Sequence, residues 1–385
     1  MIHIAVVLGT RPEAIKLAPL ILELRRVRRR VRTTVVLSGQ HAHLVTPILD
    51  FFGITPDRSI RLMRYDQTLT SLTASALEKI GSTLAAIHPD WVIVQGDTTT
   101  AMACALAAFY QKIKVAHLEA GLRTCDIYSP FPEEINRRII SQIAVLHWAP
   151  TRNAARALRR EAHPLPPARI LVTGNTVIDA LLIARARVRR RPLPDDDNAR
   201  VSAHLATGPR QLFVLVTGHR RESFGAPLRA ICAALLAVAR RDPCTVFVYP
   251  VHPNPNVLGP VERMLGGAPN ILLTPPKNYP EFIQLLDRCD VVVTDSGGVQ
   301  EEAPALGKTV LVTREVTERP EGLRTGLVRL VGHNEKRLTS ALRAALAACR
   351  RRTGNRRAAF PYGDGRAAAR CVASLLGLRV KPFSS

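Results

Sequence analysis

The chain has 385 residues, 46% of them hydrophobic, and a formal net charge of +23. The hydrophobic content excludes a disordered chain, and the length predicts two domains of roughly 170 to 190 residues each, because the whole chain is longer than a single core usually supports. There is no apolar run of the ~18 to 20 residues that span a bilayer, and the amino-terminal stretch lacks the features of a signal peptide. We therefore expect a cytoplasmic protein without a membrane partner.

The positive charge alone would suit a nucleic-acid-binding protein. Aromatic residues, which supply stacking surfaces for bases, make up only 5% of the chain. Arginine also exceeds lysine throughout, including in ordinary surface helices, so the charge is typical of a general compositional bias. We expect no nucleic-acid partner, and a filter-binding assay at ~150 mM salt would test this alternative. The positive field would still attract an anionic small substrate.

The seven cysteines are scattered along the chain without a C-x-x-C pair and without histidine partners at metal-binding spacing. This pattern favours buried, reduced thiols over disulfides or zinc ligands. The sequence predicts no metal site.

The amino-terminal half alternates apolar strands with amphipathic helices, which is typical of a doubly wound α/β fold. The predicted strands cover residues 3–9, 33–39, 90–96, 114–120 and 147–150, and the predicted helices cover residues 12–27, 68–87, 101–112 and 130–146, with another beginning near residue 42.

Prolines at 164, 166 and 167 interrupt this alternation and predict a domain boundary. A strand at 169–175 then opens the second half, and 189–200 is predicted to be a surface loop. Further strands are predicted at 211–218, 244–252, 270–276, 290–298 and 309–313, with helices at 177–188, 281–289, 299–307, 336–351 and 365–378. We expect two Rossmann-like domains, residues 1–168 and 169–362, that face a central cleft.

Two carboxylates stand at the ends of neighbouring predicted strands. Asp97 follows "WVIVQG" and Glu119 ends "KVAHLE". The carboxyl ends of parallel strands face the ligand crevice of such folds, so both acids are expected there, where they would serve proton chemistry or stabilise a cation. The simpler interpretation is that Asp97 caps the following helix and that Glu119 is a loop residue.

Two strand-to-helix loops have the composition of anion sites. In "LGTRPEAIK", Gly9 permits a tight turn, and Arg11 and Lys16 lie near the amino terminus of a helix, where anions are favoured. In "TDSGGVQEEAPALG" the residues expected to hold a diphosphate are Ser296, Gly297 and Gly298, and Glu302 is expected to accept hydrogen bonds from ribose hydroxyls. Each loop taken alone is equally compatible with an ordinary tight turn.

Further cations follow other strands of the second half. His219 stands beside Arg220 and Arg221 in "TGHRRESFG", His252 ends another strand, and Arg319 lies in a later loop. A lone histidine is usually structural, but a histidine beside two arginines in a crevice suggests a binding corner.

Ten ordered motifs between residues 9 and 365 resemble the non-hydrolysing UDP-N-acetylglucosamine 2-epimerases. They are "GTRPEAIKLAPL", "GDTTTAM", "HLEAGLRT", "YSPFPEEINRR", "TGNTVIDALL", "TGHRRESFG", "YPVHPNPNV", "TDSGGVQEEAPALGKTVLV", "TERPEG" and "NRRAAFPYGDG". The resemblance implies the two-domain fold of a large class of nucleotide-sugar glycosyltransferases (GT-B-like), with a carboxyl-terminal helix, within residues 363–385, that returns to the first domain.

The same resemblance implies roles for individual residues. The catalytic positions fall on Asp97, Glu119, Glu133 and His219, and the substrate-binding positions fall on Arg11, Lys16, His219, Phe282, Ser296, Gly297, Gly298 and Glu302. It also implies epimerisation at carbon 2 of a UDP-sugar through a glycal, no cofactor, and a homodimer. Which carboxylate removes the proton and which returns it stays open.

Some members bind a second substrate molecule that activates them. The corresponding positions here are Gln40, His41, Gln67, Arg220 and His252, but His43 and Asp66 stand where such members often carry other polar residues. Gln95 replaces a histidine that often precedes the Gly-Asp pair, and it can still donate a hydrogen bond. The alternatives are a hydrolysing epimerase, an epimerase of a related diacetamido sugar nucleotide, and a glycosyltransferase.

Overall fold

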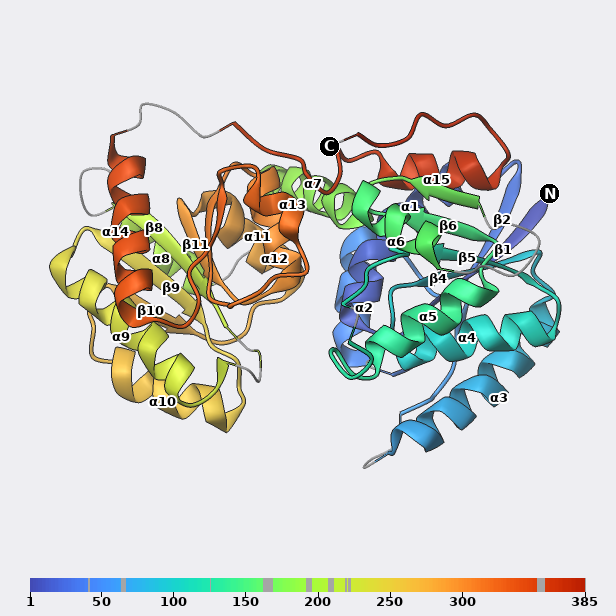
Figure 1. The fold of residues 1–385 in the computed structure, drawn as a ribbon, viewed down its shortest axis with the longest axis horizontal. Helices are drawn as coiled ribbons and strands as arrows, with labels where there is room; N and C mark the ends of the chain where they lie inside the picture. Colours follow the sequence, from blue (N-terminus) through green and yellow to red (C-terminus); the bar gives the residue numbers. More distant parts are fainter. Residues whose placement is uncertain are drawn as a thin grey trace. The chain divides into compact units, whose positions relative to one another are not determined.

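The computed structural model describes residues 1–40, 42–63, 67–124, 126–161, 169–191, 196–206, 211–218, 220, 223–351 and 357–384. The chain divides into two compact units, of which one comprises Met1–Ala180 with Tyr362–Ser385 and the other comprises Leu181–Pro361 (Figure 1). Each unit has a parallel sheet with helices between successive strands, as the sequence predicts.

In the described part of the first unit, seven strands form one parallel sheet in the order β3-β2-β1-β4-β5-β6-β7. The strands are β1 (Ile2–Leu8), β2 (Val31–Leu37), β3 (Arg58–Ser59), β4 (Trp91–Gln95), β5 (Lys114–Leu118), β6 (Leu146–Ala149) and β7 (Arg169–Val172). The helices are α1 (Arg11–Arg26), α2 (Ala42–Phe52), α3 (Leu69–Ile87), α4 (Thr99–Tyr110), α5 (Glu133–Ile143), α6 (Arg152–Arg160) and α15 (Ala367–Leu375). Strand order reverses between β1 and β4, which makes their carboxyl ends the topological switch point where ligands of such sheets bind.

The first unit extends past the boundary that the sequence predicts at residue 168. Strand β7, expected to open the second domain, pairs with β6 in the first sheet, and the division falls after Ala180, within α7 (Thr176–Arg190). The prolines near residue 165 therefore interrupt a connection inside one sheet.

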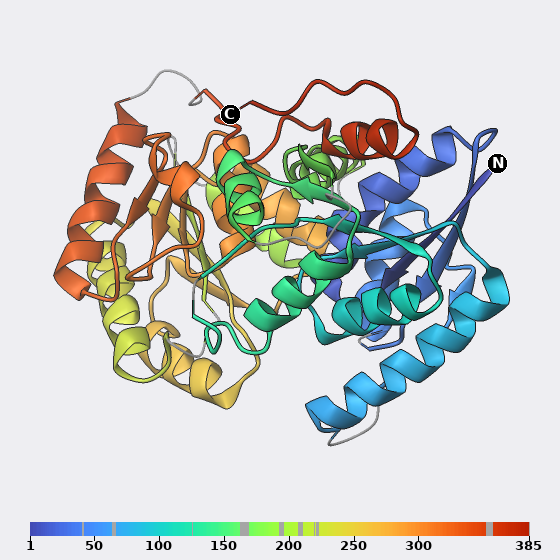
Figure 2. The ribbon, with the colours of Figure 1, turned by 45° about the vertical axis from the view of Figure 1, so that its right-hand side comes forward.

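Helix α15 belongs to the first unit although almost two hundred residues separate it from the rest of that unit. It contacts α1 (Figure 2). Trp148 of β6 donates a hydrogen bond through Nε1 to Ser374 Oγ at 2.8 Å. The carboxylate of Asp179 accepts hydrogen bonds from the backbone N–H groups of Ala367 and Ala368, which begin the helix.

The described part of the second unit has a six-stranded parallel sheet in the order β10-β9-β8-β11-β12-β13. The strands are β8 (Leu212–Thr217), β9 (Thr245–Pro250), β10 (Ile271–Thr274), β11 (Val291–Thr294), β12 (Thr309–Val312) and β13 (Val328–Leu330). The helices are α8 (Asp196–Ala206), α9 (Ala226–Arg241), α10 (Pro255–Leu265), α11 (Tyr279–Arg288), α12 (Gly297–Ala305), α13 (Pro320–Leu323) and α14 (Glu335–Arg350). This is the dinucleotide-fold strand order, with its switch point between β8 and β11.

The prediction of a loop over residues 189–200 is wrong at both ends. Helix α7 continues to Arg190, and residues from Asp196 onward form α8. Acidic residues favour the first turn of a helix because they complement its dipole, so a run of aspartates is as compatible with a helix start as with a loop.

The central strands of both sheets are apolar along their length because helices cover both faces. In β1 the residues from His3 to Leu8 are buried, and in β11 all four residues are buried. In the part of the chain that the structure describes, no helix is long and apolar enough to cross a membrane.

Candidate active site

The switch point of the first sheet is built around the carboxylate of Glu13. Its Oε2 accepts hydrogen bonds from the backbone N–H groups of Gly9 and Thr10, both at 2.7 Å, in the loop that follows β1. Its Oε1 accepts a 2.7 Å hydrogen bond from Thr98 Oγ1, in the loop that follows β4. One buried side chain therefore joins the two loops that carry Arg11 and Asp97. Burial raises the pKa of Glu13, and these hydrogen bonds oppose the rise.

Gly9 leaves room for the side chain of Ser38, the residue that follows β2. A β-carbon at position 9 would lie 2.0 Å from Ser38 Oγ. A larger residue at position 9 would therefore force the Ser38 hydroxyl to turn away.

Glu119 lies one residue past the end of β5, in a left-handed backbone conformation with φ of 62°. The residue is only 7% exposed. The structure brings together three donors on this carboxylate: Lys16 Nζ and Gln95 Nε2 donate to Oε2, the latter at 2.5 Å, and Asn175 Nδ2 donates to Oε1 at 2.9 Å. Donors and a cation favour the ionised form of a carboxyl group. Gln95 thus donates a hydrogen bond, as the sequence predicts.

Asp97 is held by helix α5. Arg137 Nε donates to Asp97 Oδ2 at 2.7 Å, and Asn136 Nδ2 donates to the backbone oxygen of Asp97 at 2.9 Å. The simpler interpretation of Asp97 as a helix cap is wrong, because Thr98 is the N-cap of α4 and accepts a hydrogen bond from Ala101 N.

His117 contacts the turn that joins β4 to Asp97. It is fully buried in β5, and its Nε2 lies 2.7 Å from the backbone oxygen of Gly96. Burial lowers the pKa of His117 to about 4, so the ring is neutral near pH 7.

The remaining predicted residues of the first unit take more peripheral positions. Glu133 begins α5 and is partly exposed, and Arg11 begins α1. Gln40 Oε1 accepts a 2.7 Å hydrogen bond from Thr100 Oγ1 at the start of α4, and Gln67 is partly exposed before α3. His41 lies outside the described residues.

In the second unit, the amino terminus of α12 lies at the switch point. Ser296 is its N-cap residue, and Gly297 and Gly298 form its first turn. Two guanidinium groups approach this turn: Arg220 Nη2 and Arg319 Nη2 lie 3.7 and 3.9 Å from the position that a β-carbon on Gly297 would occupy. A helix amino terminus with backbone N–H groups and a guanidinium nearby can bind an anion, although Arg319 is already paired with Glu301 and Glu318.

Hydrogen bonds from neighbouring residues fix the positions of Asp295 and Glu302 near this turn. Asp295 Oδ2 accepts hydrogen bonds from Arg220 N at 3.0 Å and from Ser223 Oγ at 3.2 Å. Glu302 is 5% exposed and accepts a 3.1 Å hydrogen bond from Tyr279 Oη, at the start of α11.

Three further predicted residues belong to the second unit. Phe282 lies one turn along α11 and is partly exposed. His252 is exposed after β9 and accepts a hydrogen bond from Asn254 N. His219 lies outside the described residues.

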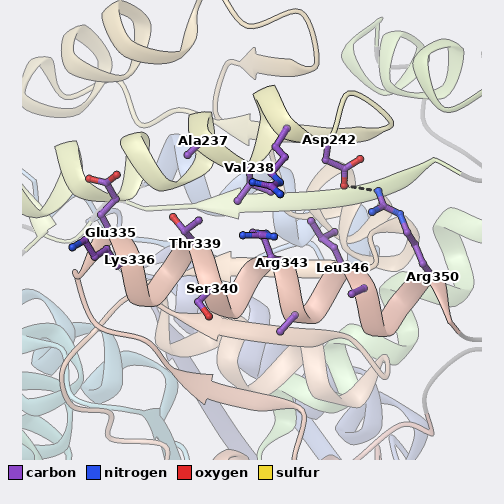
Figure 3. A pocket seen from close by; sticks show the side chains of 13 residues that line it. Ala237, Val238, Asp242, Glu335, Lys336, Thr339, Ser340, Arg343, Leu346 and Arg350 are labelled. Carbon is purple, nitrogen blue, oxygen red and sulfur yellow. Dashed lines mark hydrogen bonds and ion pairs between the residues drawn. The ribbon is translucent and has the colours of Figure 1, made fainter.

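A groove of about 760 Å³ lies elsewhere in the second unit (Figure 3). It runs between α9 and α14, where Arg350 pairs with Asp242. None of the predicted site residues lines it.

Sequence reasoning assigned no role to several residues that hold the site together. Arg137, Asn175, Asp295 and Tyr279 each bond to a predicted site residue or to the loop that carries it, and Asn175 lies 56 residues from its partner Glu119. Three of these four lie inside motifs quoted above, but a motif does not say which side chains touch.

Comparison with known proteins shows the family of the chain. The family model for UDP-N-acetylglucosamine 2-epimerase matches residues 23–376. The UDP-N-acetylglucosamine 2-epimerase of Salmonella typhimurium (strain LT2) is 45% identical over 374 residues, which cover 97% of this chain and 98% of the relative.

Two solved structures extend the likeness to three dimensions. The UDP-GlcNAc 2-epimerase of Neisseria meningitidis, solved with UDP-GlcNAc bound, has a TM-score of 0.86 and 37% identity, with 98% of this chain and 100% of that one covered. The S. aureus MnaA–UDP complex has a TM-score of 0.85 and 36% identity, with both chains fully covered. On sequence and structure alike, this chain belongs to the UDP-N-acetylglucosamine 2-epimerase family.

Proposed function

We propose that the chain interconverts UDP-N-acetylglucosamine and UDP-N-acetylmannosamine by eliminating UDP to a glycal and then adding UDP back. The observation that carries this proposal is the carboxylate of Glu119, which lies against Lys16 at the switch point of the first sheet. The relatives named UDP-N-acetylglucosamine 2-epimerase, and the Neisseria structure with UDP-GlcNAc bound, support the same substrate.

The order of bond breaking follows from the substrate. No carbonyl group activates the proton on carbon 2, so a carboxylate alone would remove it too slowly. Departure of UDP from carbon 1 must lead, and the cationic character that develops there makes the neighbouring proton acidic. Arg11, His219, Ser296 and the dipole of α12 are assigned to the developing charge on the diphosphate.

The three acids of the first unit are assigned to the sugar. Asp97, Glu119 and Glu133 would stabilise positive charge at carbon 1, remove the proton from carbon 2, and deliver a proton to its opposite face. The contacts of Asp97 and Glu119 support this role, because Arg137 and Lys16 hold the two carboxylates in place just beyond the ends of β4 and β5.

The second unit is assigned to UDP. Gly297, Gly298 and the backbone of α12 would hold the diphosphate, Glu302 the ribose hydroxyls, and Phe282 the uracil ring. UDP must stay bound while the glycal exists, because only then can it add back. We therefore place the chain in the non-hydrolysing branch, and we propose a cytoplasmic homodimer.

Activation by a second substrate molecule remains part of the proposal for Gln40, His41, Gln67, Arg220 and His252. Sigmoidal initial-rate curves would support it, and hyperbolic curves would contradict it.

The test of the proposed function is incubation with UDP-N-acetylglucosamine in deuterated water, without added cofactor, followed by proton and phosphorus NMR. We expect loss of the carbon-2 proton signal together with formation of UDP-N-acetylmannosamine. Accumulation of UDP and free N-acetylmannosamine would instead indicate the hydrolysing reaction. No change would contradict this substrate.

A further inference from the structure

We propose that Asn175 is a positioning residue that orients Glu119 and keeps it ionised, and that the segment from Tyr362 to Gly363 holds Asn175 in place for this task. The inference rests on the proposed function in one respect, since it takes Glu119 as one of the reacting acids.

The orientation of the Asn175 amide is fixed at both of its ends. Nδ2 donates to Glu119 Oε1 at 2.9 Å, and Oδ1 accepts from Val177 N at 3.1 Å. Only the nitrogen can donate and only the oxygen can accept, so the amide cannot rotate by half a turn without losing both hydrogen bonds. The residue is 3% exposed, which leaves almost no access for water to replace either partner.

Asn175 donates to Glu119 Oε1, whereas the hydrogen bonds from Lys16 and Gln95 go to Oε2. Lys16 and Gln95 both donate to Oε2, on one side of the carboxylate. A carboxylate with donors on one oxygen alone can still swing about that oxygen. The hydrogen bond to Oε1 therefore restricts this motion and helps to set the plane of the carboxylate, and it also favours the charged form of a group that is 7% exposed.

A segment from the far end of the chain sets the position of Asn175. The backbone N–H of Asn175 donates to the backbone oxygen of Tyr362 at 2.6 Å. A β-carbon on Gly363 would lie 3.0 Å from the backbone oxygen of Asn175 and 3.2 Å from its nitrogen. A β-carbon on Gly174 would in turn lie 3.1 Å from the Gly363 α-carbon. The two backbones thus lie so close that a side chain on either glycine would be crowded.

A purely structural role would be that of a cap at the start of α7, where Oδ1 accepts from Val177 N. Aspartate caps helices as well as asparagine does. The Asn175→Asp variant therefore separates the two roles: it keeps the capping oxygen and the size of the side chain, but it replaces the donor to Glu119 with a second carboxyl oxygen.

The first experiment compares the pH dependence of kcat and kcat/KM for the wild type and Asn175→Asp. Two carboxyl groups in hydrogen-bond contact cannot both ionise easily, so the acidic limb of the profile should move upward by about one pH unit or more. Profiles that coincide would overturn the proposal and leave the capping role. Asn334→Asp is the matched control, because Asn334 caps α14 in the same manner and bonds to Arg337 N. We expect its profile to follow the wild type.

A second variant covers the case in which Asn175→Asp does not fold. Asn175→Ser keeps an oxygen near Val177 N but is too short to reach Glu119. We expect kcat to fall about tenfold or more, with a smaller change in KM, because the donor to a charged group is lost. An unchanged kcat would overturn the proposal.

A third measurement does not depend on turnover and so separates this inference from the proposed function. Thermal unfolding is followed between pH 5 and pH 8 for the wild type, Asn175→Asp, Glu119→Gln and the double variant. The loss of Tm caused by Asn175→Asp should grow as the pH rises, and it should shrink when Glu119 is replaced by glutamine. A loss that is constant with pH and unaffected by Glu119→Gln would overturn the inference. An inactive wild type with the expected Tm pattern would contradict only the proposed function.

Discussion

At the scale of single residues, Asp97 and Glu119 are distinguished by the partners that hold them. Arg137 binds Asp97, whereas Lys16, Gln95 and Asn175 surround Glu119. Both acids belong to the first unit, and the residues assigned to UDP belong mostly to the second. The chemistry and the binding of UDP should therefore respond separately to substitution.

We predict that Asp97→Asn and Glu119→Gln abolish epimerisation while the Kd for UDP changes by less than about threefold, because neither acid is assigned to UDP. Arg11→Ala should weaken both epimerisation and UDP binding, because Arg11 is assigned to the diphosphate. Rates are measured by NMR and UDP binding by calorimetry. Wild-type turnover by Asp97→Asn would remove this residue from the mechanism.

Arg137 should also matter for stability, and its neighbour Arg138 provides the control. Arg137 is 8% exposed and pairs with both Asp97 and the buried Glu134, whereas Arg138 is 42% exposed and pairs with Glu134 alone. Arg137→Ala should lower the free energy of unfolding by about 3 to 5 kcal/mol, because it removes a buried guanidinium and leaves both Asp97 and Glu134 short of a partner. Arg138→Ala should cost about 1 kcal/mol or less. Urea denaturation measures both, and equal losses would contradict the assignment.

The positions of the candidate acids in the first unit could be predicted from residue types at strand ends. Asp97, Glu119 and Lys16 lie where the alternation of strands and helices predicts them. Arg137 and Asn175 could not be assigned in this way, because contacts between residues 40 and 56 positions apart depend on the exact rotation of α5 and on a turn before α7.

At the scale of elements, the predicted strands and helices mostly coincide with those of the structure, because apolar runs between turn residues are strong signals for a buried parallel sheet. Several elements were not predicted. Strand β3 has two residues and no apolar run, and α8 begins with aspartates that also suit a loop. The predicted elements also omit α6, α9, α10, α13 and β13. The domain boundary was misplaced because prolines mark a break in the chain without revealing which sheet the next strand joins.

The attachment of α15 should depend on pH through Asp179. Burial raises the pKa of this carboxyl from 3.8 to about 6, although the hydrogen bonds from Ala368 and Ala367 oppose the rise. Between about pH 4 and pH 6 the folded chain then keeps a proton that the unfolded chain has released. As the pH rises over this range, the free energy of unfolding of the wild type should therefore fall by up to about 3 kcal/mol relative to that of Asp179→Asn, which does not titrate at this position. Denaturation at several pH values measures the difference, and a constant difference would contradict the raised pKa.

At the scale of the whole molecule, the net charge of +23 should act on the substrate before it is bound. A positive field raises the rate of encounter with an anionic UDP-sugar, and salt screens that field. We predict that kcat/KM falls several-fold between ~20 and ~300 mM salt while kcat changes little. Steady-state kinetics at both concentrations measure this, and a fall confined to kcat would contradict it.

The contribution of Tyr362–Ser385 to the first unit has a consequence for how the protein is made. The ribosome completes residues 1–180 first, yet Trp148, Asp179 and Asn175 lack the partners they bond in the finished structure until residues 362–374 emerge. At about 5 to 20 residues per second, roughly 10 to 40 seconds of synthesis separate these two parts. During that interval the nascent first unit is unfinished while the second emerges, so the second unit can be the first to reach its final form.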